Sequence, residues 1–451
     1  MKHVYDYLKP ASVLVALLAM FAAVSCEDEP DRFELADGLP EVSYIRPVSA
    51  ESADSLLTGA YMDNMICIVG NNLRSIYELW FNDRKAVLNT SYITDNTLIV
   101  NVPGVIPSVV SDKIYMVTAA RDTVTYDFSV LVPGPVMTSM SCEQVPAGGE
   151  AVIYGDYFID DPNVPLTVTF SGDVKAKEIK SITKTAITVV VPEGAQEGAV
   201  TVETIYGTAK STFHYLDSRG MMFEFDGLTG LENHGWHNRT ISDEGGLTGK
   251  YVQLGDGTTV MSEDGGWNDS QFAFEYWCGS WDNPQNMTSG NGMALHNLVD
   301  FTDYGNMALK FEMCVPKDTP WSAGAMQIAF AGYDKVTYSG NPVEGYDGAV
   351  ASANAYIFNG EDGKNGSWGR ALYRPWLSAD GGVFHTDDKW ITVTVPMSDF
   401  KYDRLGSVTD NLFTSEIDFS SLTIFVVGGG VNGTECTPVI KIDNIRAVPN
   451  R

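Results

Sequence analysis

Residues 66–73 read Ile-Cys-Ile-Val-Gly-Asn-Asn-Leu, and residues 151–158 read Ala-Val-Ile-Tyr-Gly-Asp-Tyr-Phe. Both segments are short runs rich in β-branched residues that close at a glycine, which is typical of a β-strand ending at a turn. Two related segments in one chain indicate a repeated structural unit. The sequence therefore predicts two copies of one β-sheet module.

The repeat continues outside these segments. Residues 79–81 (Leu-Trp-Phe) correspond to 168–170 (Val-Thr-Phe), and residues 98–103 (Leu-Ile-Val-Asn-Val-Pro) correspond to 187–192 (Ile-Thr-Val-Val-Val-Pro). The second copy is longer, which fits a loop inserted around residues 160–163. Because no apolar run of helical period and useful length occurs anywhere in the chain, we predict an all-β protein.

This pattern resembles the IPT/TIG immunoglobulin-like family. The resemblance rests on an opening strand at residues 45–47, the strand that closes in Gly-Asn-Asn-Leu, and the strand that ends in Val-Pro. It covers about residues 40–216 and implies spacer or docking modules rather than catalysts. We place the first immunoglobulin-like domain at residues 40–133 and the second at residues 134–216, with Pro133-Gly134-Pro135 as the break.

The N-terminus reads as an export signal at residues 1–25, in which a short basic head precedes an apolar run over residues 13–24. That run is shorter than the roughly 20 residues that a spanning helix needs. It ends in Ala-Val-Ser-Cys26, which resembles a bacterial lipobox and implies lipidation of Cys26. Residues 26–39 then form an acidic tether. Its acidic start resembles the signal of Bacteroidetes lipoproteins for display on the outer face of the outer membrane.

Charge narrows the range of partners. The chain has 29 Lys and Arg residues against 58 Asp and Glu residues, a formal net charge of −29. That balance argues against nucleic acid and against anionic lipid headgroups, so we expect membrane contact through the lipid anchor only. The five cysteines other than Cys26 show no CxxC spacing and no neighbouring His, and no EF-hand loop occurs. We therefore expect no cofactor and no metal.

Residues 220–451 differ from the repeated modules. Eight or more short strands separated by long loops rich in Gly, Asn and Trp suit a jelly-roll-like β-sandwich. Eight of the nine tryptophans lie in this segment, several beside Gly, Asn or Asp. Flat aromatic faces carried on polar loops are suited to a sugar ring, which has an apolar C–H face and a rim of hydroxyls. Residues 389–396 and 442–445 also look like parts of carbohydrate-binding jelly rolls.

Taken in order, the lipoprotein signal, the tandem modules and the tryptophan-rich sandwich resemble the surface glycan-binding protein B family of Bacteroidetes polysaccharide utilisation loci. This sequence has two clear spacers where some relatives have three. The resemblance implies non-catalytic capture of a β-glucan, most of all xyloglucan, for degradation and uptake. It also implies an outer-membrane TonB-dependent transporter and a companion binding lipoprotein as partners.

The resemblance implies an aromatic platform, on which we place Trp236, Tyr276 and Trp277. Trp236 lies in a loop of polar and flexible residues. Adjacent residues of a strand face opposite sides, so at most one of Tyr276 and Trp277 is buried unless the strand ends there. Trp281 and Trp321 are further candidates.

Residues 370–376 add Tyr373, Arg374 and Trp376, which combine aromatic faces with guanidinium donors for hydroxyl rims. An ordinary strand that pairs its arginines with carboxylates explains this segment equally well. Trp390, in an alternating strand, is predicted to lie in the core. Trp267 and Trp368 are left unassigned.

Two other classes of function are open. A glycoside hydrolase needs two carboxylates at a set separation, for which Glu224, Asp226, Glu275 and Glu312 are the candidates. A protein with 58 acidic residues offers many such pairs by chance, and no HExxH or GxSxG motif is present. An adhesin that binds a host protein is the third class, and retardation in gels that contain β-glucan would distinguish it from a glycan binder.

Overall fold

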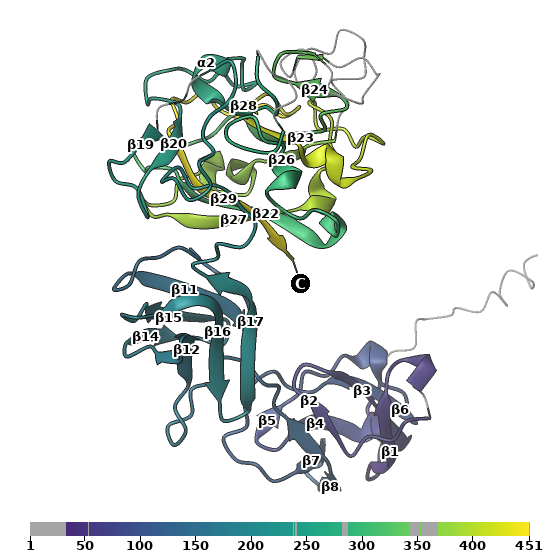
Figure 1. Ribbon diagram of the computed structural model, residues 1–451. Helices are drawn as coiled ribbons and strands as arrows, with labels where there is room; N and C mark the ends of the chain where they lie inside the picture. The colour runs from purple at the N-terminus through teal and green to yellow at the C-terminus, as the bar shows by residue number, and fades with distance from the viewer. Residues whose placement is uncertain are drawn as a thin grey trace, which may run out of the picture. The chain divides into compact units, whose positions relative to one another are not determined.

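The computed structural model describes residues 33–52, 54–237, 239, 241–281, 287–341, 351–352 and 369–450. The chain divides into two compact units, residues 1–133 and residues 134–451. Strands dominate both units (Figure 1), so the all-β prediction is confirmed. The signal segment and Cys26 lie outside the described residues. No helix in the described part of the chain has the length and apolar character needed to cross a bilayer.

The first unit is an immunoglobulin-like sandwich of two antiparallel sheets. One sheet has the order β1 (Glu41–Pro47), β3 (Met65–Asn71) and β6 (Thr97–Asn101); the other has the order β5 (Arg84–Lys85), β4 (Ile76–Phe81), β7 (Lys113–Thr118) and β8 (Thr123–Asp127). A short parallel pair joins β2 (Gly59–Tyr61) to β9 (Ser129–Leu131). Single 3-10 turns are η1 (Ala50–Ser52), η2 (Leu73–Ser75) and η3 (Thr90–Tyr92).

The second unit begins with a second sandwich of the same kind. One sheet has the order β10 (Val136–Met140), β11 (Glu150–Asp156), β15 (Ala186–Val190), β14 (Ile179–Ile182). The other sheet has the order β13 (Val174–Lys175), β12 (Thr167–Ser171), β16 (Gln196–Thr204), β17 (Gly207–Tyr215). The alternating burial of these strands places their apolar side chains in one core between the sheets.

The repeated glycine has the same purpose in both modules. Gly70 lies inside β3 and Gly155 inside β11, so the predicted glycine turn is wrong at these positions. A Cβ on Gly70 would run into the carbonyl oxygen of Glu41, and one on Gly155 into that of Val136. The pairing register of the adjoining strands shifts at the same place in both modules. Glycine is therefore required where the opening strand approaches closely.

The rest of the second unit is a larger sandwich of two sheets, which we call the C-terminal sandwich. The first sheet has the order β19 (Ile241–Ser242), β20 (Tyr251–Leu254), β29 (Ile440–Pro449), β22 (Met307–Cys314), β27 (Ile391–Pro396), and β18 (Met221–Phe223) also pairs with β29. The second sheet has the order β21 (Ala273–Tyr276), β28 (Ser421–Val427), β23 (Ala325–Ala331), β26 (Ala371–Tyr373). Figure 1 shows the labelled strands of both sheets, among them β20, β22, β23, β28 and β29, gathered in one domain.

Short elements complete the C-terminal sandwich. They are α2 (Asp269–Phe272), the parallel pair β24 (Val336–Thr337) and β25 (Ala351–Ser352), and the 3-10 turns η4 (Leu295–Asn297), η5 (Tyr304–Asn306), η7 (Pro375–Leu377), η8 (Asp380–Gly382), η9 (Met397–Asp399) and η10 (Glu416–Phe419). Aromatic rings fill the core between the sheets, and Phe301 stacks on Phe419 with ring centroids 4.2 Å apart. The cysteines of the described chain are free thiols, and Cys67 is buried as expected.

Candidate functional site

The sheet β21-β28-β23-β26 has one face toward the core and one face away from it. Phe274 faces the core, because its ring lies 5.2 Å from that of Phe223 in the other sheet. Ile424 is paired with Phe274 and faces the same way. Since successive residues of a strand point to opposite faces, the adjacent Phe425 and its partner Gln327 point away from the core. We call this second face the outer face.

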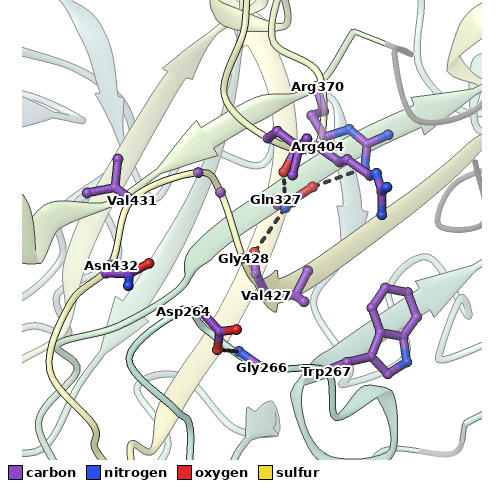
Figure 2. Close-up of a pocket in the computed structure, with 13 residues that line it drawn as sticks. Asp264, Gly266, Trp267, Gln327, Arg370, Arg404, Val427, Gly428, Val431 and Asn432 are labelled. Carbon is purple, nitrogen blue, oxygen red and sulfur yellow. Dashed lines mark hydrogen bonds between the residues drawn. The ribbon is translucent and has the colours of Figure 1, made fainter.

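Trp267 lies on the outer face. Its ring packs edge-on against Phe425 with centroids 4.9 Å apart, and the residue is 51% exposed. Trp267 borders a pocket of about 390 Å³ (Figure 2). The other lining residues are Asp264, Gly266, Gln327, Arg370, Arg404, Leu405 and residues 427–432. The pocket combines one exposed aromatic face with amide, guanidinium and backbone groups, a lining typical of small-ligand sites.

Gln327 organises the polar wall of this pocket. Its Nε2 donates to the backbone oxygens of Arg404 (3.1 Å) and Val427 (2.9 Å), and its Oε1 accepts a 3.0 Å bond from Nη1 of Arg370 (Figure 2). Burial lowers the pKa of Arg370 to about 10, which leaves the guanidinium charged at neutral pH. The wall is therefore fixed before any ligand arrives.

A glycine turn closes the pocket. Gly428, Gly429 and Gly430 have φ values of 47°, 98° and 75°, the left-handed region that side chains disfavour. A Cβ on Gly430 would also run into the backbone of Leu405. Arg374 binds this turn through a 2.7 Å bond from Nη1 to the Gly429 oxygen. Arg374 thus supports the pocket from outside its lining, through a bond to a backbone carbonyl and not to a carboxylate.

The loop that carries Trp236 is held on the same face by Glu275. Oε2 of Glu275 accepts hydrogen bonds from the backbone N–H groups of Trp236 (2.9 Å) and His237 (3.2 Å). Oε1 faces Nδ1 of His237 at 3.0 Å. The carboxylate is almost fully buried, whereas Trp236 is 53% exposed. The indole is therefore presented to solvent from a fixed backbone.

Trp281 and Tyr338 lie beside this loop. The Trp281 ring centroid is 6.2 Å from that of Tyr338, and Trp281 is 58% exposed. Tyr338 donates from its hydroxyl to the Gly235 oxygen (3.3 Å) and packs over Trp277, with centroids 6.0 Å apart. Trp281 is thus supported by a second aromatic layer.

Trp267 lies on the same surface as Trp236 and Trp281. Nε1 of Trp277 donates to Oγ1 of Thr423 at 3.1 Å, and Thr423 is two residues from Phe425 on β28, under Trp267. Two residues of a strand span roughly 7 Å. The loops are also linked directly, because Nε2 of His237 lies 3.6 Å from Asp269 in α2. The outer face therefore carries Trp236, Trp267 and Trp281 around one sheet.

Four of the predicted ligand-binding residues, two from the platform and two of the further candidates, are buried instead, which corrects the sequence interpretation. Tyr276, Trp277 and Trp321 have no exposed surface, and Trp376 has almost none. Tyr276 and Trp277 do point to opposite faces: Tyr276 packs in the core beside Phe223, and Trp277 lies on the outer face, where Tyr338 packs over it. Each has its polar atom satisfied internally: Tyr276 binds Met293, Trp277 binds Thr423, Trp321 binds Ala323 and Trp376 binds Gly324. A side chain without exposed surface cannot stack on a ligand.

Other sequence candidates fall in different places. Tyr373 is paired with Met326 of the core row and lies 6.2 Å from Trp321, so it faces the core. Burial raises its pKa to about 12. Trp390 is only partly buried and packs against the core of the second immunoglobulin-like module, not in the core of its own sandwich. Trp368 lies outside the described residues.

The carboxylates considered for hydrolysis have internal partners. Glu224 accepts from the backbone N–H groups of Asp226 (2.7 Å) and Thr229 (2.9 Å), and Glu312 binds Arg446 on the adjacent strand of the same sheet. Glu275 holds the Trp236 loop. Within the described residues, His, Cys, Asp and Glu side chains form no group of three that could hold a metal ion.

The sequence interpretation left Trp267 unassigned and did not identify Gln327, Arg404 or Tyr338. The one local signal was the triple glycine after a buried apolar strand, because such a run marks a turn with special backbone angles.

Two immunoglobulin-like sandwiches followed by a larger sandwich with exposed tryptophans on one sheet define a modular ligand-binding protein. A family model described as "Surface glycan-binding protein B xyloglucan binding domain" matches residues 215–449, more than half of the chain. The chain therefore belongs to the surface glycan-binding protein B family.

Individual relatives agree with this membership. The crystal structure of the surface glycan-binding protein PbSGBP-B from Prevotella bryantii has 44% sequence identity and a TM-score of 0.74, and the match covers 92% of this chain and 100% of that one. An IPT/TIG domain-containing protein from Bacteroides ovatus is 26% identical over 232 residues, which cover 47% of this chain and 46% of that protein. The match thus spans about half the length of that relative.

Proposed function

We propose that the chain binds a β-glucan, most of all xyloglucan, on the outer face of the sheet β21-β28-β23-β26. The observation that carries the proposal is the placement of Trp236, Trp267 and Trp281, each about half exposed, around one face. Indole rings cover the apolar faces of sugar rings, and the pocket beside Trp267 offers hydrogen-bonding groups for hydroxyls. Membership of a family whose domain model is named for xyloglucan supports the choice of glycan.

We also propose that binding occurs without cleavage. Glu224, Glu275 and Glu312 each hold protein groups in place, and a catalytic pair needs carboxyl groups that reach the same glycosidic bond. Because each aromatic stack contributes about 0.5–1.5 kcal/mol beyond area burial, three stacks and a few polar contacts correspond to roughly millimolar to micromolar affinity.

The proposed setting is the outer surface of the outer membrane. Lipidation of Cys26 would anchor the protein, and residues 26–39 would form an acidic tether. Captured glycan would pass to an outer-membrane TonB-dependent transporter and a companion binding lipoprotein. The net charge of −29 supports a neutral ligand over nucleic acid.

The test is a binding screen with the full chain. Affinity gels and calorimetry with xyloglucan, mixed-linkage β-glucan, mannan and xylan should show retardation and heat of binding with at least one β-glucan, strongest with xyloglucan. Stronger binding of another β-glucan would change the proposed identity of the ligand but not the proposed binding site. No binding to any polysaccharide would refute the proposal, and release of reducing sugar would favour the hydrolase alternative.

A further inference from the structure

The first sheet of the C-terminal sandwich carries charged residues on the face away from the core. In β22, Leu309 and Phe311 belong to the core, and Lys310 and Glu312 point the other way. Arg446 of β29 is paired with Lys310 and shares this face. Such alternation normally marks a face open to water. Glu312 and Arg446 nevertheless have no exposed surface, and Lys310 is only 7% exposed.

The second immunoglobulin-like module covers these charges. Glu143, in the segment between β10 and β11, binds Nζ of Lys310 through Oε1 and accepts a 2.8 Å bond from Nη2 of Arg446 through Oε2. Its backbone N–H donates to Oγ1 of Thr392 at 2.7 Å. The backbone N–H of Thr392 donates in turn to Ser141 at 2.9 Å. Contacts of backbone and side chain therefore fix Glu143 over the sheet.

The charges balance only when both parts are present. Arg446 also binds both oxygens of Glu312, at 2.7 and 3.0 Å, so two carboxylates meet two cations. Burial by itself would lower the pKa of Arg446, but Glu312 and Glu143 raise it overall. Without Glu143 the sandwich would keep two cations and one carboxylate in a buried site. An uncompensated buried charge is strongly destabilising.

Apolar contacts accompany the charge cluster. Trp390 and Leu247 of the C-terminal sandwich pack against the core of the second immunoglobulin-like module. Trp390 also lies 5.5 Å from Tyr251 of β20, ring to ring. The partial burial of Trp390 is thus explained by packing between the two folds.

We infer that residues 134–451 fold as one cooperative unit, in which Glu143 supplies a carboxylate that the C-terminal sandwich needs. The second immunoglobulin-like module is then part of the binding unit rather than a separable spacer. It covers the first sheet, whereas Trp236, Trp267 and Trp281 lie on the outer face of the second sheet. The module therefore leaves the proposed ligand face open. The cooperative unit does not depend on which ligand binds.

The test is calorimetric unfolding of the full chain carrying Glu143→Gln. The transition of residues 134–451 should move down as a whole by on the order of 10 °C. The matched control is Glu150→Gln, which removes an exposed ion pair with Lys180 in the same module and should shift that transition by no more than about 2 °C. Equal shifts for the two variants, or separate melting of the module and the sandwich, would overturn the inference.

A double-mutant cycle and a wild-type measurement complete the test. Lys310→Met should be less harmful in the Glu143→Gln background than alone, because the charge partner is already lost. Additive effects would contradict coupling through the cluster. In native-state hydrogen exchange of the unmodified chain, the slowest amides of β16 and β22 should open together. Opening of β16 with β22 still protected would show two independent units.

Discussion

The backbone N–H of Trp236 donates a 2.9 Å hydrogen bond to Oε2 of Glu275, a carboxylate that is 1% exposed. The same carboxylate binds the N–H and the ring of His237. A buried carboxylate surrounded by N–H donors ties one exposed indole to the rigid strand β21. The position of Trp236 is therefore set by the sheet rather than by its loop.

Glu275→Gln should weaken this attachment. The amide replaces one acceptor oxygen by an NH₂ group that faces N–H donors, so we expect a loss of about 1–3 kcal/mol in stability and a several-fold loss in glycan affinity. Denaturant unfolding and calorimetry measure the two quantities. Glu232→Gln, at an exposed site near the same loop, is the control and should change neither. Equal behaviour of the two variants would show that Glu275 does not position the loop.

Each exposed tryptophan should contribute separately to binding. Trp236→Ala, Trp267→Ala and Trp281→Ala should each lower affinity about two- to tenfold, which corresponds to a stack of about 0.5–1.5 kcal/mol. Their melting temperatures should stay close to that of the unmodified chain, since these side chains are half exposed. Tyr92→Ala, at an exposed aromatic of the first unit, should leave affinity unchanged. Unchanged affinity in all three tryptophan variants would show that the glycan binds to another part of the surface.

The buried tryptophans should act on stability instead. Trp321→Ala removes a fully buried ring and should cost about 3–5 kcal/mol. Affinity of the folded variant should match that of the unmodified chain, because Trp321 lies on the core side of the second sheet. Comparison of its binding curve with that of Trp236→Ala is the check. A large loss of affinity in the folded Trp321→Ala variant would show that Trp321 contributes to ligand binding, as the sequence interpretation proposed.

The fold could be predicted because local chemistry decides it. Gly70 and Gly155 occur in matching strands, and short β-branched runs recur at matching spacings. The sequence could not show why these positions need glycine. The reason is the close approach of β1 to Gly70 and of β10 to Gly155, and these contacts join residues that are far apart in the sequence. The environment of Lys310 and Glu312 also depends on contacts that are distant in sequence. Their alternation with apolar residues predicts an open face, and only the fold shows that another module covers it.

The site could be predicted only in part. Polar neighbours correctly marked Trp236 and Trp281 as exposed, but Trp321, which precedes Ser322 and lies near a glycine, is buried. A loop that folds over a core offers backbone carbonyls to an indole N–H, as Ala323 does for Trp321. Sequence neighbours cannot distinguish that arrangement from an exposed loop. Gln327 and Arg404 belong to segments far apart in the chain, so their meeting needed the tertiary structure.

The stability of the second unit should depend on pH through Asp443. Burial raises the pKa of this carboxyl to about 8, and Asn444 and Thr248 are its hydrogen-bond partners. The folded chain keeps a proton that the unfolded chain releases above about pH 4, so the contribution of Asp443 to stability falls as pH rises from about 4 to 8. Above about pH 8 both states are ionised, and the contribution is constant.

Asp443→Asn isolates this effect. The amide oxygen still accepts from the Asn444 N–H, and the NH₂ group faces the Thr248 hydroxyl without carrying charge. Relative to the unmodified chain, the variant should be similar in stability at pH 4 and gain on the order of 1 kcal/mol per pH unit toward pH 8. Denaturant unfolding of both proteins at pH 5, 6.5 and 8 measures the difference. A difference that does not grow with pH would show that Asp443 is already ionised in the fold.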